Sequence, residues 1–174
     1  MSFVYITGAP GIGKSTIQNN LEGSGFEVYD LDDSRFGGPH SKASGDRVVI
    51  PPAEQREDDW FDRHEWLVYR TTFEELKLES KDKDIIVCGV AESDNKVINL
   101  FDKIIYLHVS DDTLKKRLLS RIGNDYGKND SELNEILRRK KKLDEKYTDS
   151  SVDRVDASGS LESVVNNILA HIKT

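Results

Sequence analysis

Eight consecutive residues near the N-terminus fit the pattern G-x-x-x-x-G-K-[ST] without a gap. They are Gly8, Ala9, Pro10, Gly11, Ile12, Gly13, Lys14 and Ser15. In this pattern the glycines let backbone N–H groups turn inward around phosphate oxygens. The residues from Thr16 onward form a helix whose N-terminus favours the binding of anions. The lysine reaches the β- and γ-phosphates and the serine hydroxyl ligates Mg²⁺. The pattern predicts binding of a nucleoside triphosphate with Mg²⁺.

Three carboxylates form a second group of candidate chemical residues: Asp30, Asp32 and Asp33. An alcohol that accepts a phosphoryl group needs a carboxylate to take its proton. A phosphate acceptor is already anionic, needs arginine clamps, and would be repelled by three carboxylates. The aspartates therefore favour a hydroxyl acceptor, the alternative being a turn with capping aspartates.

Arginines downstream of the aspartates leave a different acceptor open. They are Arg35, Arg47, Arg56, Arg63 and Arg70. One or two of them could clamp an anionic group on the substrate, and otherwise they form a solvated charged face. Trp60, His64 and Trp66 could form an aromatic wall for a base or sugar, with His64 donating a hydrogen bond, or they could be helix core.

Alternating apolar strands and helices must position these residues. Strands are expected at 3–7, 26–29, 85–90, 103–109 and 152–156. Helices are expected at 16–21, 56–79, 110–122 and 131–147, with a last helix capped by Ser160, and 36–55 is expected to be a long loop. This order predicts an α/β fold with a parallel sheet and helices on both faces. Ligands in such sheets bind at the carboxyl ends of the strands, where the glycine loop and the aspartates lie.

Composition limits the partners of the chain. It has 174 residues, 36% of them hydrophobic, which is enough for one domain. A net charge of −7 argues against nonspecific binding to nucleic acid or to an anionic membrane. There is one cysteine, Cys88, and we find neither a signal peptide nor an apolar run long enough to span a membrane. We expect a cytoplasmic protein without membrane or nucleic-acid partners.

The motifs together resemble the small P-loop kinases of the nucleoside-monophosphate-kinase fold, such as adenylate, shikimate and gluconate kinases. Three features carry this resemblance, and the first is the glycine loop. The second is Asp30-Leu31-Asp32, which looks like the Asp-x-Asp of shikimate kinases. The third is the pair Arg117 and Arg121, which looks like the family's R-x-x-x-R before the lid. It implies a P-loop NTPase fold with a five-stranded parallel sheet, a core at 1–33 and 82–174, a substrate-binding insertion at about 34–80 and a short lid at about 123–130.

The resemblance also implies roles for individual residues. Asp30 would help to hold Mg²⁺ with Ser15, and Asp32 would grip the acceptor hydroxyl and take its proton. Arg117 and Arg121 would bind ATP, Arg121 contacting adenine or phosphates, and Arg138 or Arg139 would be the lid arginine. Lys14, Asp32 and Arg121 are thus the expected catalytic residues. The expected substrate residues are Asp32, Asp33, Arg35, Arg63 and His64.

The sequence departs from the family pattern in two places. The apolar strand that ends at Val90 is not followed by the Walker B aspartate of many P-loop proteins, and residues 34–80 match no family well enough to transfer a substrate. We therefore expect an ATP-dependent phosphotransferase acting on a hydroxyl of a small molecule, such as a nucleoside or a sugar.

Three alternatives remain open at the level of the sequence. One is a nucleoside monophosphate kinase. A second is a polynucleotide 5′-hydroxyl kinase that uses the basic run 138–142, which is otherwise a solvated helix face. The third is a non-catalytic nucleotide switch, although a GTPase is disfavoured because Asn95-Lys96-Val97-Ile98 lacks the aspartate of N-K-x-D.

Overall fold

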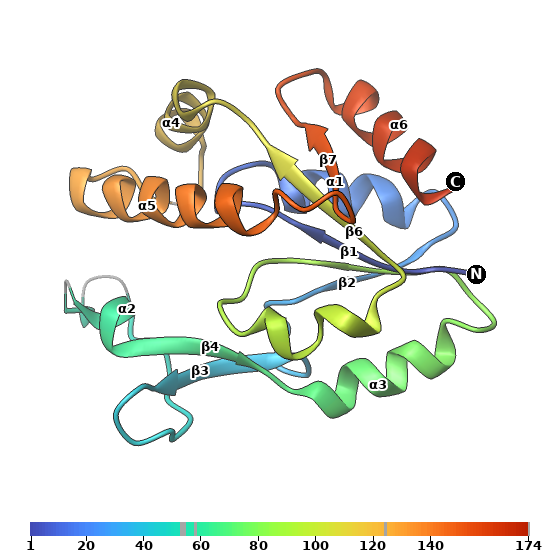
Figure 1. The fold of residues 1–174 in the computed structure, drawn as a ribbon. Coiled ribbons are helices and arrows are strands. Elements are labelled where there is room, and N and C mark those ends of the chain that lie inside the picture. The colour runs from blue at the N-terminus through green and yellow to red at the C-terminus, as the bar shows by residue number, and fades with distance from the viewer. Residues whose placement is uncertain (53–54, 58, 124, 174) are drawn as a thin grey trace.

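A parallel five-stranded sheet forms the centre of the protein, as a computed structural model describes it for residues 1–52, 55–57, 59–123 and 125–173 (Figure 1). Its strands are β1 (Phe3–Thr7), β2 (Glu27–Asp30), β5 (Ile85–Cys88), β6 (Lys103–His108) and β7 (Asp153–Asp156). Their order in the sheet is β2-β5-β1-β6-β7, and every neighbouring pair is parallel. The predicted sheet is confirmed, and β1 lies in its middle.

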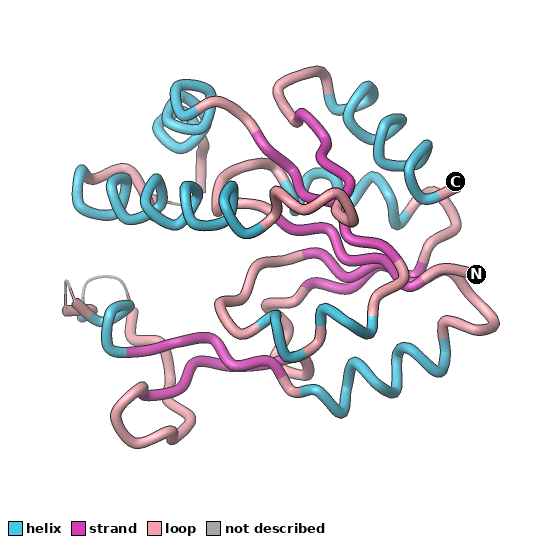
Figure 2. The backbone as a smooth tube through the Cα atoms, in the orientation of Figure 1, coloured by secondary structure: helices cyan, strands magenta, loops and turns pink. Residues whose placement is uncertain are grey.

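Helices cover both faces of this sheet (Figure 2). The helices of the described residues are α1 (Lys14–Glu22), α2 (Trp60–Arg63), α3 (Arg70–Glu79), α4 (Asp111–Ser120), α5 (Asp130–Lys146) and α6 (Leu161–Ile172), with short 3₁₀ turns η2 (Asp94–Lys96) and η3 (Ile98–Leu100). Of these, α2 lies away from the five-stranded sheet, next to the strand β4 (His64–Val68) (Figure 1). Every residue of β1 and β5 is buried, as expected for the centre of a parallel sheet. The expected serine cap of α6 is confirmed, since Ser160 accepts a bond from the N–H group of Ser163. Ser110 caps α4 in the same way by accepting from the N–H group of Thr113.

Alternation along the strands divides the core into two clusters. Val4 and Ile6 pack on one face with apolar residues of α1, α4 and α6. Phe3 and Tyr5 pack on the other face with Phe73 of α3. Because both faces are closed in this way, ligands are left with the edge at which the strands end.

The segment before α3 differs from the predicted helix over 56–79. Within the described residues it contains α2, the strand β4 (His64–Val68) and then α3. β4 pairs antiparallel with β3 (Gly37–Ser41), so the predicted loop at 36–55 is also wrong over those five residues. Helical spacing was misleading here because pairing with a strand distant in sequence overrides local propensity. No helix among the described residues is long and apolar enough to cross a membrane.

Candidate functional site

The glycine loop has the backbone geometry that phosphate binding requires. Gly13, which precedes α1, has φ +111°, and Gly11 has φ +83°. Helix α4 lies so close to Gly11 that a Cβ atom added there would be 2.5 Å from Leu118 Cδ2. The first turn of α1 carries no acidic residue that could compete with an anion. The loop and the helix therefore present N–H groups and the positive end of the helix dipole to a ligand.

Lys14 lies folded over this loop. Its Nζ donates hydrogen bonds to the carbonyls of Gly8, at 2.7 Å, and Ala9, at 3.1 Å. Burial lowers the pKa of Lys14 to about 8, although the charges of Asp32, Cys88 and Asp30 act in the opposite direction. Carbonyl oxygens are the hydrogen-bond partners recorded for this partly buried ammonium among the described residues, so it is suited to bind a negatively charged phosphate oxygen.

A cavity of about 1230 Å³ opens where the strands end. Its lining includes the glycine loop from Pro10 to Ser15, the residues Thr16, Asp30, Asp32, Arg117 and Arg121, and segments after β5 and β7. Pockets for one small molecule are typically about 300–1,000 Å³. This volume therefore has room for a nucleotide and an acceptor together.

Asp32 and Asp30 face this cavity, and Asp33 does not. Asp30 Oδ1 accepts a 2.9 Å bond from the Asp32 N–H, which fixes the turn after β2. Burial, followed by the charge of Asp30, raises the pKa of Asp32, while Lys14 opposes this rise. Asp33 is instead bonded to Arg35, whose guanidinium lies over the rings of Tyr29 and Phe36.

Arg117 joins the glycine loop to the segment after β7. Its Nη1 donates to the Ile12 carbonyl and its Nη2 to the Ala157 carbonyl, each at 2.7 Å. Arg121 also lines the cavity and donates to the Tyr126 carbonyl in the expected lid. Another wall of the cavity is formed by residues that were not predicted from the sequence: Ala157, Gly159, Leu161 and Val164. The position of Ala157 directly after a parallel strand was the signal that could have identified it.

One face of α5 supplies the basic side of the cavity. Its lining residues follow helical spacing: Glu135, Arg138, Arg139, Lys142, Leu143 and Lys146. Lys140 points elsewhere and pairs with Asp144 at 2.7 Å and Asp111 at 3.0 Å, and Lys141 is not part of the lining. The basic run 138–142 is therefore divided between the cavity and other surroundings.

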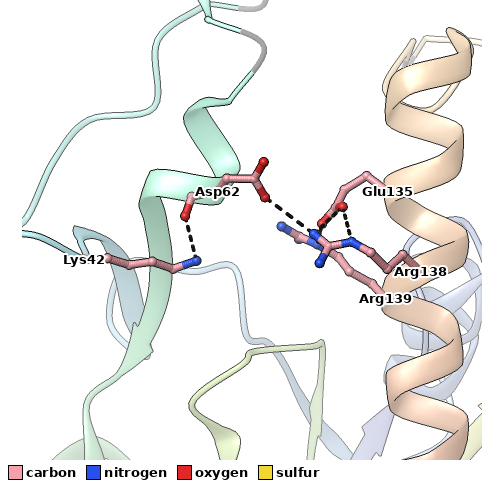
Figure 3. A network of polar contacts seen from close by, with 5 residues as sticks. All are labelled: Lys42, Asp62, Glu135, Arg138 and Arg139. Carbon is pink, nitrogen blue, oxygen red and sulfur yellow. Dashed lines mark hydrogen bonds and ion pairs between the residues drawn. The ribbon is translucent and has the colours of Figure 1, made fainter.

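The helix α2 meets this basic face through a polar network (Figure 3). Arg138 Nη2 lies 3.4 Å from Asp62 Oδ1, and Lys42 donates to the Asp62 carbonyl at 3.0 Å. Glu135 accepts bonds from Nε of Arg138, at 2.8 Å, and Nε of Arg139, at 2.7 Å. The segment around 34–80 and the helix after the expected lid thus touch across the cavity.

Trp60, His64 and Trp66 of this segment all line the cavity. The rings of Trp60 and His64 stack with centroids 4.1 Å apart, and His64 Nδ1 lies 2.6 Å from the Trp60 carbonyl. Trp66 and Pro39, which are opposite each other on β4 and β3, also line it. Arg63 is on the surface, where it pairs with Glu57 and Asp59. Of the expected substrate residues, the structure therefore brings Asp32 and His64 to the cavity, but not Asp33, Arg35 or Arg63.

The cavity is suited to a magnesium-bound nucleotide. No group of three potential ligands among His, Cys, Asp and Glu occurs in the described part of the chain. Mg²⁺ is usually held by one or two protein ligands together with phosphate oxygens and water. Ser15 and Asp30, which both line the cavity, fit such a site.

Comparisons with known proteins agree with this geometry. A family model described as an AAA domain matches residues 4–138. No curated protein matches the sequence. Similar solved structures include a shikimate kinase from Acinetobacter baumannii in complex with shikimate, with 15% identity, a TM-score of 0.62, and coverage of 99% of this chain and 93% of that chain.

Two further solved structures share the fold. One is a gluconokinase from Sinorhizobium meliloti 1021, with 15% identity, a TM-score of 0.57, and coverage of 99% of this chain and 91% of that one. The other is a deoxyadenosine kinase from M. mycoides with bound dATP, with 16% identity, a TM-score of 0.53 and full coverage of both chains (100% each). At these identities the likeness shows the fold, that of the small P-loop kinases, and no particular substrate.

Proposed function

Because the chain belongs to the AAA domain family and has the fold of the small P-loop kinases, we propose that it transfers the γ-phosphate of Mg·ATP to a hydroxyl group of a small molecule. One observation carries the proposal: Lys14 and Asp32 line the same cavity, near enough for their charges to influence each other's pKa. A phosphate-binding ammonium beside a carboxylate of raised pKa is the pair that phosphorylation of an alcohol needs.

The proposed reaction is an in-line displacement at the γ-phosphorus. The acceptor oxygen forms a bond to phosphorus while the bond from phosphorus to the β–γ bridging oxygen breaks, and ADP leaves. The proton of the acceptor hydroxyl passes to a carboxylate oxygen of Asp32. The raised pKa of Asp32 makes it a better base than an aspartate of ordinary pKa.

Positive charge around the moving phosphoryl group comes from the chain. Lys14 and Arg121 lie on the cavity wall and would interact with the charge that develops on the phosphoryl and β-phosphate oxygens. Mg²⁺, held by Ser15 and Asp30 together with the nucleotide, would supply further charge neutralisation. Arg117 holds the glycine loop in its binding shape through the Ile12 carbonyl.

The insertion and the lid have proposed roles in the same scheme. We assign acceptor binding to 34–80, because Trp60, His64 and Trp66 of that segment line the cavity. We assign water exclusion to the lid at 123–130, where Tyr126 also lines the cavity. Gly127, with φ +92°, would place a Cβ 2.6 Å from Ile136 Cδ1, so a side chain there would separate the lid from α5.

Transfer of label from γ-labelled Mg·ATP into pooled acceptors tests this function. The pools are nucleosides, nucleoside monophosphates, sugars and polyols with their acids, and 5′-hydroxyl oligonucleotides, with Lys14→Ala as control. We expect label in a pool of small hydroxyl compounds. Label attached to the phosphate group of a monophosphate, or label in oligonucleotides, would overturn the choice of acceptor. Nucleotide binding without transfer to any pool would favour a switch.

A further inference from the structure

The buried carboxylate of Asp94 has no part in the proposed reaction, although its ion-pair partner Lys146 lines the cavity. Asp94 begins η2 after β5 and is 1% exposed. It pairs with the ammonium of Lys146 and accepts a bond from the Tyr147 hydroxyl and another, at 3.4 Å, from the Tyr5 hydroxyl. The three partners come from β1 and from the C-terminal end of α5, which this carboxylate therefore joins.

Burial of this carboxylate requires a matching charge. An ionised carboxylate without a partner is strongly destabilising in a protein interior, whereas an opposite charge and hydrogen bonds offset much of its desolvation cost. Burial and the charge of Asp94 raise the pKa values of Tyr5 and Tyr147, so both phenols stay protonated and donate their hydrogen bonds. Lys146 is the one cation recorded against Asp94 in the described residues, so the fixed carboxylate also fixes the lysine.

Lys146 is positioned between the protein interior and the ligand. Its side chain is 34% exposed and lines the cavity, whereas its partner carboxylate is inaccessible. The end of α5 that bears it is further fixed, because Tyr147 stacks on Tyr106 with centroids 5.1 Å apart and the Tyr106 hydroxyl donates to Asp144 Oδ1 at 2.8 Å. The cation is therefore preorganised instead of sampling the many rotamers of a surface lysine.

The surroundings of Asp94 indicate which part of the cavity Lys146 adjoins. β5 and β2 lie on one side of β1, and β6 and β7 lie on the other. Asp94 follows β5 and Asp32 follows β2, whereas Ala157, the partner of Arg117, follows β7. Ser93, which directly precedes Asp94, donates a hydrogen bond to the Trp66 carbonyl and accepts one from the Val68 N–H, so the Asp94–Lys146 pair is held beside the segment to which acceptor binding is assigned.

We propose that Asp94 is a positioning residue, which holds the Lys146 ammonium at the acceptor side of the cavity so that it binds an anionic group of the acceptor. This inference rests on the proposed function. It adds that the acceptor carries a carboxylate or a phosphate in addition to its hydroxyl. The proposal also gives Lys146 a role that Lys141 does not have, because Lys141 carries the same charge on the same helix but does not line the cavity.

A double-mutant cycle tests the kinetic part of the proposal. The acceptor is the one that takes label in the pooled assay, and the variants are Asp94→Asn, Lys146→Met, their combination, Lys146→Arg as rescue and Lys141→Met as matched control. We expect Lys146→Met to raise the acceptor KM roughly 10-fold or more, with little change in kcat, since a charge-assisted bond is lost. Asp94→Asn should also raise the acceptor KM, and the double variant should have the same acceptor KM as Lys146→Met alone.

The choice of asparagine separates positioning from simple support of the fold. In Asp94→Asn the amide oxygen still accepts from the tyrosine hydroxyls, so a purely structural Asp94 would tolerate the change, and Lys146→Arg should recover most of the acceptor affinity. An acceptor KM that stays within 2-fold of wild type in Lys146→Met would overturn the proposal. A loss of Mg·AMP-PNP affinity in that variant with the acceptor KM unchanged would assign Lys146 to the γ-phosphate and would also overturn it.

The rate at which each lysine is acetylated, measured by mass spectrometry, tests the positioning of Lys146 without any acceptor. Lys146 should react several-fold more slowly than Lys141 in the wild-type chain, and at a similar rate in Asp94→Asn. Equal rates in the wild type would show that Asp94 does not hold Lys146. Slow acetylation of Lys146 combined with no label in any acceptor pool would mean that Asp94 does hold Lys146 but that the proposed function fails. The inference would then be overturned because Lys146 would have no acceptor to bind.

Discussion

The guanidinium of Arg117 bridges the Ile12 carbonyl of the glycine loop and the Ala157 carbonyl after β7, with both bonds at 2.7 Å. Charge-assisted bonds of this kind contribute about 1.5–3 kcal/mol each. The bridge fixes the loop against α4. Preorganisation of this loop lowers the ordering cost of binding phosphates.

Replacing Arg117 by methionine should therefore weaken nucleotide binding. We expect the Kd for Mg·AMP-PNP, measured by calorimetry, to rise about 10-fold or more because the bridge is lost. Lys116→Met is the matched control, since Lys116 is an exposed cation on the same helix that does not line the cavity. Equal affinities in the two variants would show that the bridge does not shape the loop.

Replacing Gly11 by alanine should remove nucleotide binding and destabilise the fold. The new Cβ would lie 2.5 Å from Leu118 Cδ2 at a backbone φ of +83°, so it adds a clash to backbone strain. Gly45→Ala separates the two effects, because Gly45 has φ +76° with nothing within 4 Å of an added Cβ. We expect Gly45→Ala to cost about 1 kcal/mol of unfolding free energy and Gly11→Ala about 2–4 kcal/mol. Equal losses in urea titrations would show that Leu118 moves aside freely.

The activity should follow a bell-shaped pH dependence. Lys14 must be charged to bind phosphate, so kcat/KM should fall as the pH rises through about 8, which is the pKa of Lys14 in the free enzyme. Asp32 must be ionised to accept a proton, so kcat/KM should also fall as pH decreases through a pKa above 3.8. Initial rates from pH 4 to 10 check both limbs. A profile that stays flat up to pH 10 would show that Lys14 does not titrate in this range.

The sheet and the glycine loop could be predicted because their signals are local. A run such as Ile85–Cys88 shows a buried parallel strand on its own, and the spacing from Gly8 to Ser15 shows the loop. The positions of Asp30 and Asp32 at the cavity followed from their place after a strand. These inferences needed no knowledge of distant contacts.

Other features depend on contacts between residues distant in sequence. His64–Val68 has spacing that a helix could also use, and pairing with Gly37–Ser41 decides the outcome. Asp33 follows Asp32 directly, yet the turn directs it to Arg35 and away from the cavity. Asp94 gave no signal in the sequence because its partners Tyr5 and Lys146 are 89 and 52 residues away.

The central claim is that Asp32 is the base for a hydroxyl acceptor, and a comparison of Asp32→Asn with Asp33→Asn tests it most directly. Both changes remove one carboxylate from the same turn, but Asp32 lines the cavity whereas Asp33 is bonded to Arg35 outside it. With the acceptor that takes label, we predict that Asp32→Asn lowers kcat by about 10²-fold or more while the Kd for Mg·AMP-PNP stays within about 3-fold of wild type. Asp33→Asn should retain nearly full kcat. Wild-type turnover in Asp32→Asn would contradict the account, because the transfer would then proceed without the carboxylate that the account requires.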